Sequence, residues 1–186
     1  MKELFQLIKD LLTLARAKAL GLRVSIEQVY TVECFRNGKL LWVDNIHNLV
    51  VTAGLTDILD KYFKGSTYTA AHNFGLKGTG TPDAADTMGS HATWSEVTDY
   101  DEATRPSITW GTVSAGSVNN SASKCVFTIS GTVTVYGGFV VCGTGAGTKG
   151  ATTGTLVGAG DFTGGSRAVV DNDVLNVTVT ATLTAS

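Results

Sequence analysis

The C-terminal run of the chain alternates strictly between apolar and polar side chains. From Leu175 to Leu183 every second residue is apolar, and the residues between them are Asn176 and a series of threonines. A period of two puts one set of side chains on each face of a β-strand, so this run predicts a half-buried strand. Residues 24–34 alternate similarly, except at Gln28 and Val29. The Asn37-Gly38 pair that follows is typical of a tight hairpin turn, because both residues tolerate positive φ.

The composition extends this interpretation to the rest of the chain. Threonine is the commonest residue, and the 186 residues include 22 glycines, two prolines and only 16% charged residues. Thr and Gly are poor helix formers, and disorder needs more charge and proline. The sequence therefore predicts seven to nine strands in a mainly β, antiparallel β-sandwich or jelly-roll-like domain. Further strands are expected at 68–76, 92–100, 107–113, 124–129 and 132–141. The last two are expected to form a hairpin around Ser130-Gly131, and the glycine-rich run 143–165 is expected to be a mobile loop.

Two segments follow a helical period instead. A short helix is predicted over 53–64, with Thr52 as N-cap and an apolar stripe packed on the sheet, formed by Leu55, Ile58, Leu59, Tyr62 and Phe63.

The other helix is amphipathic and covers residues 1–21, with Gly21 as its stop. It makes residues 1–22 an arm, and residues 23–186 the β-domain. Such a helix is marginal alone in water, so its apolar stripe must be covered by its own β-domain, by a sister helix in an oligomer, or by a groove on another protein. The candidate partner-binding residues are Leu4, Leu7, Ile8, Leu11 and Leu12.

Motifs that would carry catalysis or bind a metal do not stand out. His47, His72 and His91 lack the spacing of a metal site, and 143–150 lacks the Gly-Lys-Ser/Thr order and following helix of a phosphate loop. No Gly-x-Ser-x-Gly elbow occurs. The three cysteines form no CxxC pair and are interpreted as small apolar residues in or beside strands, with Cys125 and Cys142 candidates to face each other across a hairpin. We therefore expect a protein that is not an enzyme and needs no metal or cofactor.

Two other groups of side chains admit a functional alternative. Six acidic residues in 83–102 are interpreted as solvated loop carboxylates, rather than calcium ligands: Asp83, Asp86, Glu96, Asp99, Asp101 and Glu102. Asp171 and Asp173 form a second such loop. Four aromatic residues are interpreted as core, with a sugar-stacking platform as the alternative: Trp42, Trp94, Trp110 and Tyr100.

Charge and hydropathy exclude several classes of partner. The net charge of −2 argues against a basic nucleic-acid-binding face. The sequence contains no run of 18 apolar residues, so it predicts no membrane span. Lys9, Asp10, Arg16 and Lys18 interrupt the first apolar run, so it does not have the form of a signal peptide. The expectation is a protein made in the cytosol, with no nucleic acid or membrane partner.

One succession of short motifs, spread over about 45–184, resembles small virion structural proteins of tailed bacteriophages. The motifs are Asn48 to Leu55, Phe74-Gly75-Leu76, Ala85 to Glu96, Tyr100 with Arg105-Pro106, Asn120 to Ile129, Val135 to Phe139, Gly154 to Val157 and Val174 to Thr178. The resemblance implies a non-enzymatic virion protein, such as a homotrimeric capsid decoration or cement protein that binds the major capsid protein or another virion protein. The alternatives are a tail, collar or fibre component, or a glycan-binding β-sandwich module.

Overall fold

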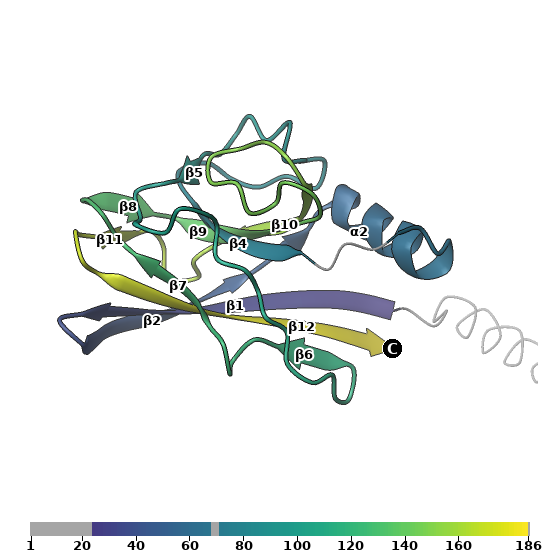
Figure 1. Ribbon diagram of the computed structural model, residues 1–186, viewed down its shortest axis with the longest axis horizontal. Helices are drawn as coiled ribbons and strands as arrows, with labels where there is room; N and C mark the ends of the chain where they lie inside the picture. Colours follow the sequence, from purple (N-terminus) through teal and green to yellow (C-terminus); the bar gives the residue numbers. More distant parts are fainter. Residues whose placement is uncertain (1–23, 68–70, 186) are drawn as a thin grey trace, which may run out of the picture.

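The computed structural model describes residues 24–67 and 71–185. This part of the chain is mainly β and antiparallel, as predicted, and its two five-stranded sheets lie over one another as layers of a β-sandwich (Figure 1). The amphipathic helix predicted over 1–21, with Leu4, Leu7, Ile8, Leu11 and Leu12, lies outside the described residues. Within the described residues, no helix has the length and hydropathy needed to cross a membrane.

The first sheet is built on two long strands at the ends of the described chain. β1 (Val24–Arg36) and β12 (Val174–Ala185) pair antiparallel in an unbroken register from Val24 opposite Ala185 to Phe35 opposite Val174. β2 (Lys39–His47) pairs with the other side of β1, while β6 (Ser117–Asn119) and β7 (Cys125–Thr128) both pair with β12. The predicted hairpin is confirmed, since Asn37 and Gly38 have φ of 51° and 73° between β1 and β2.

The two alternating runs bury the faces that the sequence predicts. Tyr30, Val32 and Cys34 of β1 and Leu175, Val177 and Val179 of β12 are fully buried. Gln28 lies on the same inner face, and this polar residue is what interrupts the pattern. Its Oε1 accepts hydrogen bonds from the Tyr30 hydroxyl at 3.0 Å and the Asn48 amide at 2.5 Å, so the polar group is buried with partners.

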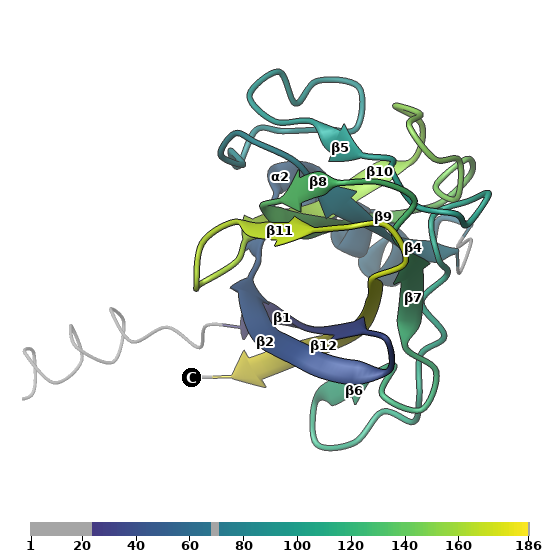
Figure 2. The same cartoon turned by 90° about the vertical axis from the view of Figure 1, so that its left-hand side faces the viewer.

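The second sheet is covered on both faces. Its order is β3 (Leu49–Val50), β10 (Thr155–Asp161), β9 (Gly137–Cys142), β4 (His72–Lys77) and β5 (Glu96–Val97). One face packs on the core between the sheets. The other carries a second hydrophobic cluster, to which the segments outside the sheet contribute Met88, Trp94 and Ala146. A two-stranded sheet of β8 (Val133–Val135) and β11 (Arg167–Val169) lies beside these layers (Figure 2).

Several expected strands are wrong in this region. β10 lies inside the run 143–165 that the sequence predicts as a loop, so that loop is limited to the segment before Thr155. Only Glu96–Val97 of 92–100 is a strand, and the run 107–113 makes a single isolated bridge. β7 pairs with β12 and β8 pairs with β11, so no hairpin forms around Ser130-Gly131. β10 is buried on both faces and does not alternate, which removes the sequence signal of a strand there.

The short helical segment is where the sequence places it, but it packs differently. It consists of α2 (Thr52–Ile58) and a π-helical turn, η1 (Leu59–Phe63), and its N-cap is Val51 instead of Thr52. The residue it buries against the sheet is Gly54, where an added Cβ would lie only 2.4 Å from the Val157 carbonyl oxygen. The segment thus approaches β10 through a position without a side chain, and four of the five residues of the stripe predicted to pack on the sheet are exposed instead.

Candidate functional site

The apolar stripe of the helical segment forms one side of an exposed groove at one end of the molecule. The exposed fractions are 43% for Leu55, 58% for Leu59, 81% for Tyr62 and 75% for Phe63. Ile26 and Leu183, which face each other across the β1–β12 pair, complete the lining with Ile58. We call this surface the end groove: Ile26, Leu55, Ile58, Leu59, Tyr62, Phe63 and Leu183. Its volume is about 760 Å³.

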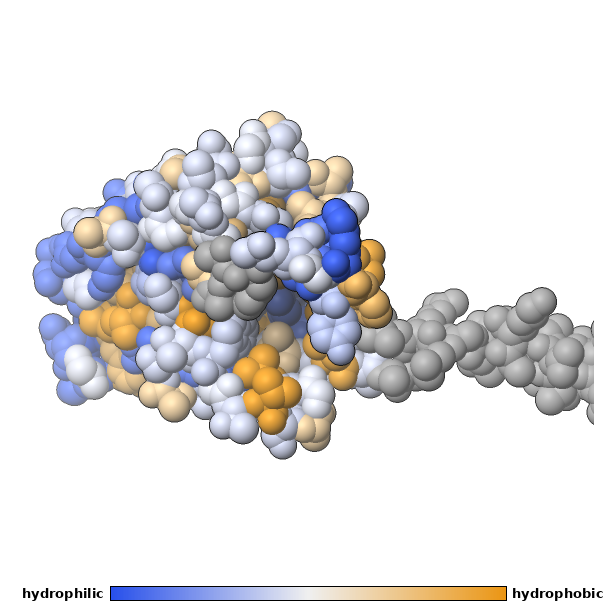
Figure 3. All heavy atoms as spheres, turned by 45° about the vertical axis from the view of Figure 1, so that its right-hand side comes forward, coloured by the Kyte–Doolittle hydropathy of each residue, from blue (hydrophilic) through white to orange (hydrophobic). Residues whose placement is uncertain are grey.

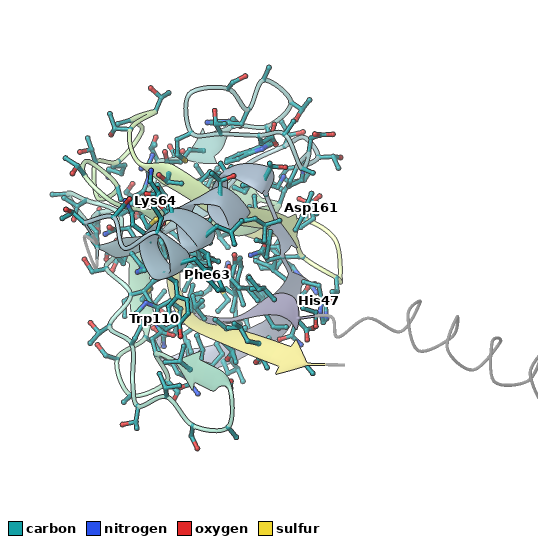
Figure 4. The ribbon with its side chains drawn as sticks, turned by 90° about the vertical axis from the view of Figure 1, so that its right-hand side faces the viewer. His47, Phe63, Lys64, Trp110 and Asp161 are labelled. Atoms are coloured by element: carbon teal, nitrogen blue, oxygen red, sulfur yellow. The ribbon has the colours of Figure 1, made fainter. Side chains whose placement is uncertain are left out.

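A π-helical turn forms part of the end groove. The π-turn of η1 follows directly on α2, and π-turns are frequent at functional sites. Tyr62 and Phe63 lie edge to face at 5.1 Å, so the two rings support one another while remaining open to solvent. Figure 3 shows hydrophobic side chains gathered at this end of the body, and in Figure 4 Phe63 lies between the helical segment and β12. Large apolar side chains gathered at one site are unusual on a free surface and mark interaction sites.

A second exposed apolar surface lies at the opposite end of the sandwich, on the β1–β2 hairpin (Figure 1). We call it the hairpin patch, and it consists of Leu40, Leu41 and Val43, with exposed fractions of 52%, 47% and 48%. β2 is an edge strand of its sheet. An exposed apolar edge strand is a template for association, which proteins usually protect with charge or proline. The sequence signal was the unbroken apolar run after Asn37-Gly38.

One cluster of reactive side chains was not apparent from spacing. His72 and Cys142 are opposite one another in the β4–β9 pair, and the Cys142 thiol donates a long hydrogen bond, 3.8 Å, to Asp57 of α2. The types resemble a cysteine nucleophile with its base. However, burial and the nearby Asp57 carboxylate raise the pKa of Cys142 to about 11, and burial lowers the pKa of His72 despite Asp57. A thiol held protonated is a poor nucleophile, so this cluster does not support cysteine catalysis.

The other sequence-predicted candidates are dispersed or structural. His47 is exposed, and His91 stacks on Trp94 at 4.0 Å. All three cysteines are free and buried, and they lie in strands as expected, in β1, β7 and β9. Among the residues described, no three His, Cys, Asp or Glu side chains converge as metal ligands.

The interpretation of the acidic segment as solvated is wrong for two of its carboxylates. Asp86 is buried and accepts a 2.8 Å hydrogen bond from the Trp94 indole. The Glu96 carboxylate accepts two hydrogen bonds, 2.8 and 2.7 Å, from the fully buried Arg105 guanidinium. Asp173 of the second loop is also buried and paired, with Arg36. Carboxylates with all their partners in the protein are poorly placed to bind calcium.

The four aromatic residues are buried or partly buried. Trp94 and Tyr100 are buried, as the core interpretation predicts, while Trp42 and Trp110 are partly buried against the main core. Burial of Trp94 and Tyr100 removes two of the four rings that a sugar-stacking platform would use.

The glycine-rich loop is held in place by the same arginine that pairs with Glu96. Arg105 donates hydrogen bonds to the carbonyl oxygens of Ala146 at 2.9 Å and Ala151 at 2.6 Å. Lys149, which a phosphate loop would direct to its ligand, donates to the Tyr100 carbonyl oxygen at 2.7 Å and lies over the Tyr100 ring. These contacts give the loop a fixed position on β5 and its neighbours.

Comparison with known proteins does not assign the chain to a group. No family model matches the sequence, and no curated protein matches it. The function is therefore argued from the two exposed apolar surfaces and from the motifs of the sequence.

Proposed function

We propose that this protein is a non-enzymatic structural protein of a tailed-phage virion, and that it acts as a capsid decoration or cement protein bound to the major capsid protein lattice. The observation that carries an assembly role is the exposed apolar stripe of α2 and η1, which its own sheet leaves uncovered. The resemblance of the motifs over about 45–184 supports the virion as the setting. Localisation in the virion follows from the same proposal.

The hairpin patch is the surface that we assign to the lattice partner. Its edge strand presents backbone hydrogen-bonding groups beside Leu40, Leu41 and Val43, a combination that suits addition of a strand from another protein. Each such contact is small. A homotrimer that presents three copies to a repeating lattice gains affinity through effective concentration.

Copy number tests the location on the particle. Quantitative mass spectrometry of purified particles of the encoding phage should find hundreds of copies, as a capsid decoration protein requires. About a dozen copies would replace this proposal with the tail, collar or fibre alternative, and absence from the particles would overturn the virion role altogether.

A matched pair of valines tests the hairpin patch. Val43→Asp places a charge in the patch, while Val126→Asp changes a similarly exposed valine, 42% against 48%, on β7 outside both apolar surfaces. We expect Val43→Asp to lower retention on capsids roughly tenfold or more in co-sedimentation, because burying an apolar side chain contributes about 1.5–3 kcal/mol. Equal retention of the two variants would remove the patch from the contact. A glycan array with the intact chain tests the sugar-binding alternative.

A further inference from the structure

The end groove lies where the N-terminal segment joins the β-domain. β1 begins at Val24, and Ile26, two residues along the strand, lines the groove opposite Leu183. The sequence before β1 contains the stripe of Leu4, Leu7, Ile8, Leu11 and Leu12. An apolar groove and a predicted amphipathic helix therefore belong to one chain, and each needs a cover from water.

We propose that the end groove binds the predicted helix of residues 1–21 from a second copy of this chain, so that neighbouring copies exchange arms. This inference concerns association of the chain with itself. It holds whether or not the lattice contact assigned to the hairpin patch is right.

Dimensions favour a second copy over the arm's own domain. In a helix with a rise of 1.5 Å per residue, Leu12 and Leu4 lie roughly 13 and 25 Å before Gly21. The groove begins beside the start of β1, and its helical side, from Leu55 to Phe63, is only about 12 Å long. A helix folded back at Gly21 would place the part with Arg16 and Lys18 along the groove, and the far half of the stripe would extend past it.

The connection between arm and strand leads to the same conclusion. Only Leu22 and Arg23 separate Gly21 from β1, and a short hinge of this kind favours exchange between copies over closure on one copy. A helix from a second copy is not tied to the near end of the groove, so it can slide until its leucines face Leu59 and Phe63. Each copy then gives one arm and receives one, so a closed dimer or ring leaves no stripe exposed.

Disulfide trapping separates exchange from self-closure. A chain with Leu7→Cys is mixed with an isotope-labelled chain carrying Leu59→Cys, and the mixture is oxidised. Leu59 is exposed, so its substitution should leave the fold unchanged. The three native cysteines are buried, so they should form few disulfides of their own. We expect a disulfide between the two chains, identified by mass spectrometry. Lys39→Cys, exposed on the hairpin at the opposite end, replaces Leu59→Cys as the control and should give no link.

Two outcomes would overturn the proposal. A doubly substituted chain, Leu7→Cys with Leu59→Cys, that closes within one molecule while the mixture gives no link would show that each arm covers its own groove. No link in either experiment would show that the arm does not occupy the groove.

Light scattering on the intact chain gives a second measurement, independent of cysteine chemistry. Leu59→Asp should raise the dissociation constant of the oligomer roughly tenfold or more, and Leu41→Asp, a leucine of comparable exposure in the hairpin patch, should leave it unchanged. A wild-type chain that is monomeric at 100 µM in this assay, or equal behaviour of the two variants, would contradict arm exchange.

Discussion

Asp173 joins the end of β1 to the turn that precedes β12. Its side chain is fully buried, its two oxygens accept hydrogen bonds from the Arg36 guanidinium at 2.7 and 2.8 Å, and the Val170 N–H donates at 2.9 Å. The hydrogen bonds from Arg36 outweigh the effect of burial and hold the pKa of Asp173 below its ordinary value. The carboxylate is therefore a structural element of the strand end.

Asp173 makes the folded protein less stable as the pH falls. Because its pKa is lower in the folded protein, its contribution is present above the unfolded value of about 3.9 and is lost as the pH falls through the folded value. We expect Asp173→Asn to lower the free energy of unfolding at pH 7 by about 2 kcal/mol, and to flatten its decline below pH 4. Urea unfolding between pH 2.5 and 7 measures both. The exposed neighbour provides the control, since Asp171→Asn should change neither; equal slopes for Asp173→Asn and the wild type would refute the assignment.

Two reciprocal contacts between a glycine and a phenylalanine explain two of the sequence motifs named above. A Cβ at Gly75 would lie 2.1 Å from the Phe139 ring, and a Cβ at Gly138 would lie 2.2 Å from the Phe74 ring. Each ring thus lies over a glycine of the neighbouring strand, on opposite faces of the β4–β9 pair. The Phe74-Gly75 and Gly138-Phe139 motifs are therefore packing requirements of the second sheet.

At the scale of elements, Arg105 connects the segments that cover the outer face of the second sheet. Its side chain joins Glu96 of β5 to two carbonyls of the glycine-rich loop and lies 5.3 Å from the Phe139 ring centre. A lysine keeps the charge but lacks the planar fork that holds three partners at once.

Arg105→Lys should loosen the glycine-rich loop. Losing one or two charge-assisted hydrogen bonds costs about 1.5–3 kcal/mol, so we expect amide exchange in 143–154 to become roughly tenfold faster or more. Hydrogen–deuterium exchange with mass spectrometry measures this segment directly. Arg167→Lys, which alters the pair with Asp44 at a different site, should leave the loop unchanged. Unchanged exchange in the Arg105 variant would mean that the glycine turns alone fix the loop.

The sequence places most accurately the elements with one solvent-facing side, although β4 and β9, which are buried, also overlap the expected strands 68–76 and 132–141. β1, β12 and the Asn37-Gly38 hairpin alternate or carry turn residues, and the structure confirms them. β10 does not alternate, because both of its faces are covered. It also lies in a glycine-rich run, which the sequence predicts as a loop. The helix 53–64 was predictable from its period, but its orientation was not. That orientation depends on the close approach of Gly54 to Val157, a contact between distant parts of the chain.

At the scale of the whole molecule, the two hydrophobic clusters found among the described residues belong to the β-domain. The buried residues of the two clusters run from Tyr30 to Val179, and the long β1–β12 pair forms the centre of the first sheet. The end groove and the hairpin patch lie at opposite ends of this body, so a self-contact at one end is compatible with a lattice contact at the other (Figure 1).

Removing residues 1–21 should therefore separate folding from assembly. We expect the truncated chain to keep its thermal unfolding midpoint within a few degrees when measured as a monomer, because the described residues of both clusters lie between Tyr30 and Val179. Its oligomer should dissociate in light scattering, and its retention on capsids should fall with the loss of multivalent binding. The full-length chain with Leu7→Gln and Leu11→Gln controls for the deletion and should behave in the same way. A large drop in the melting temperature of the truncated monomer would instead make the arm part of its own domain. Full retention of the truncated chain on capsids would show that the hairpin patch binds without help from neighbouring copies.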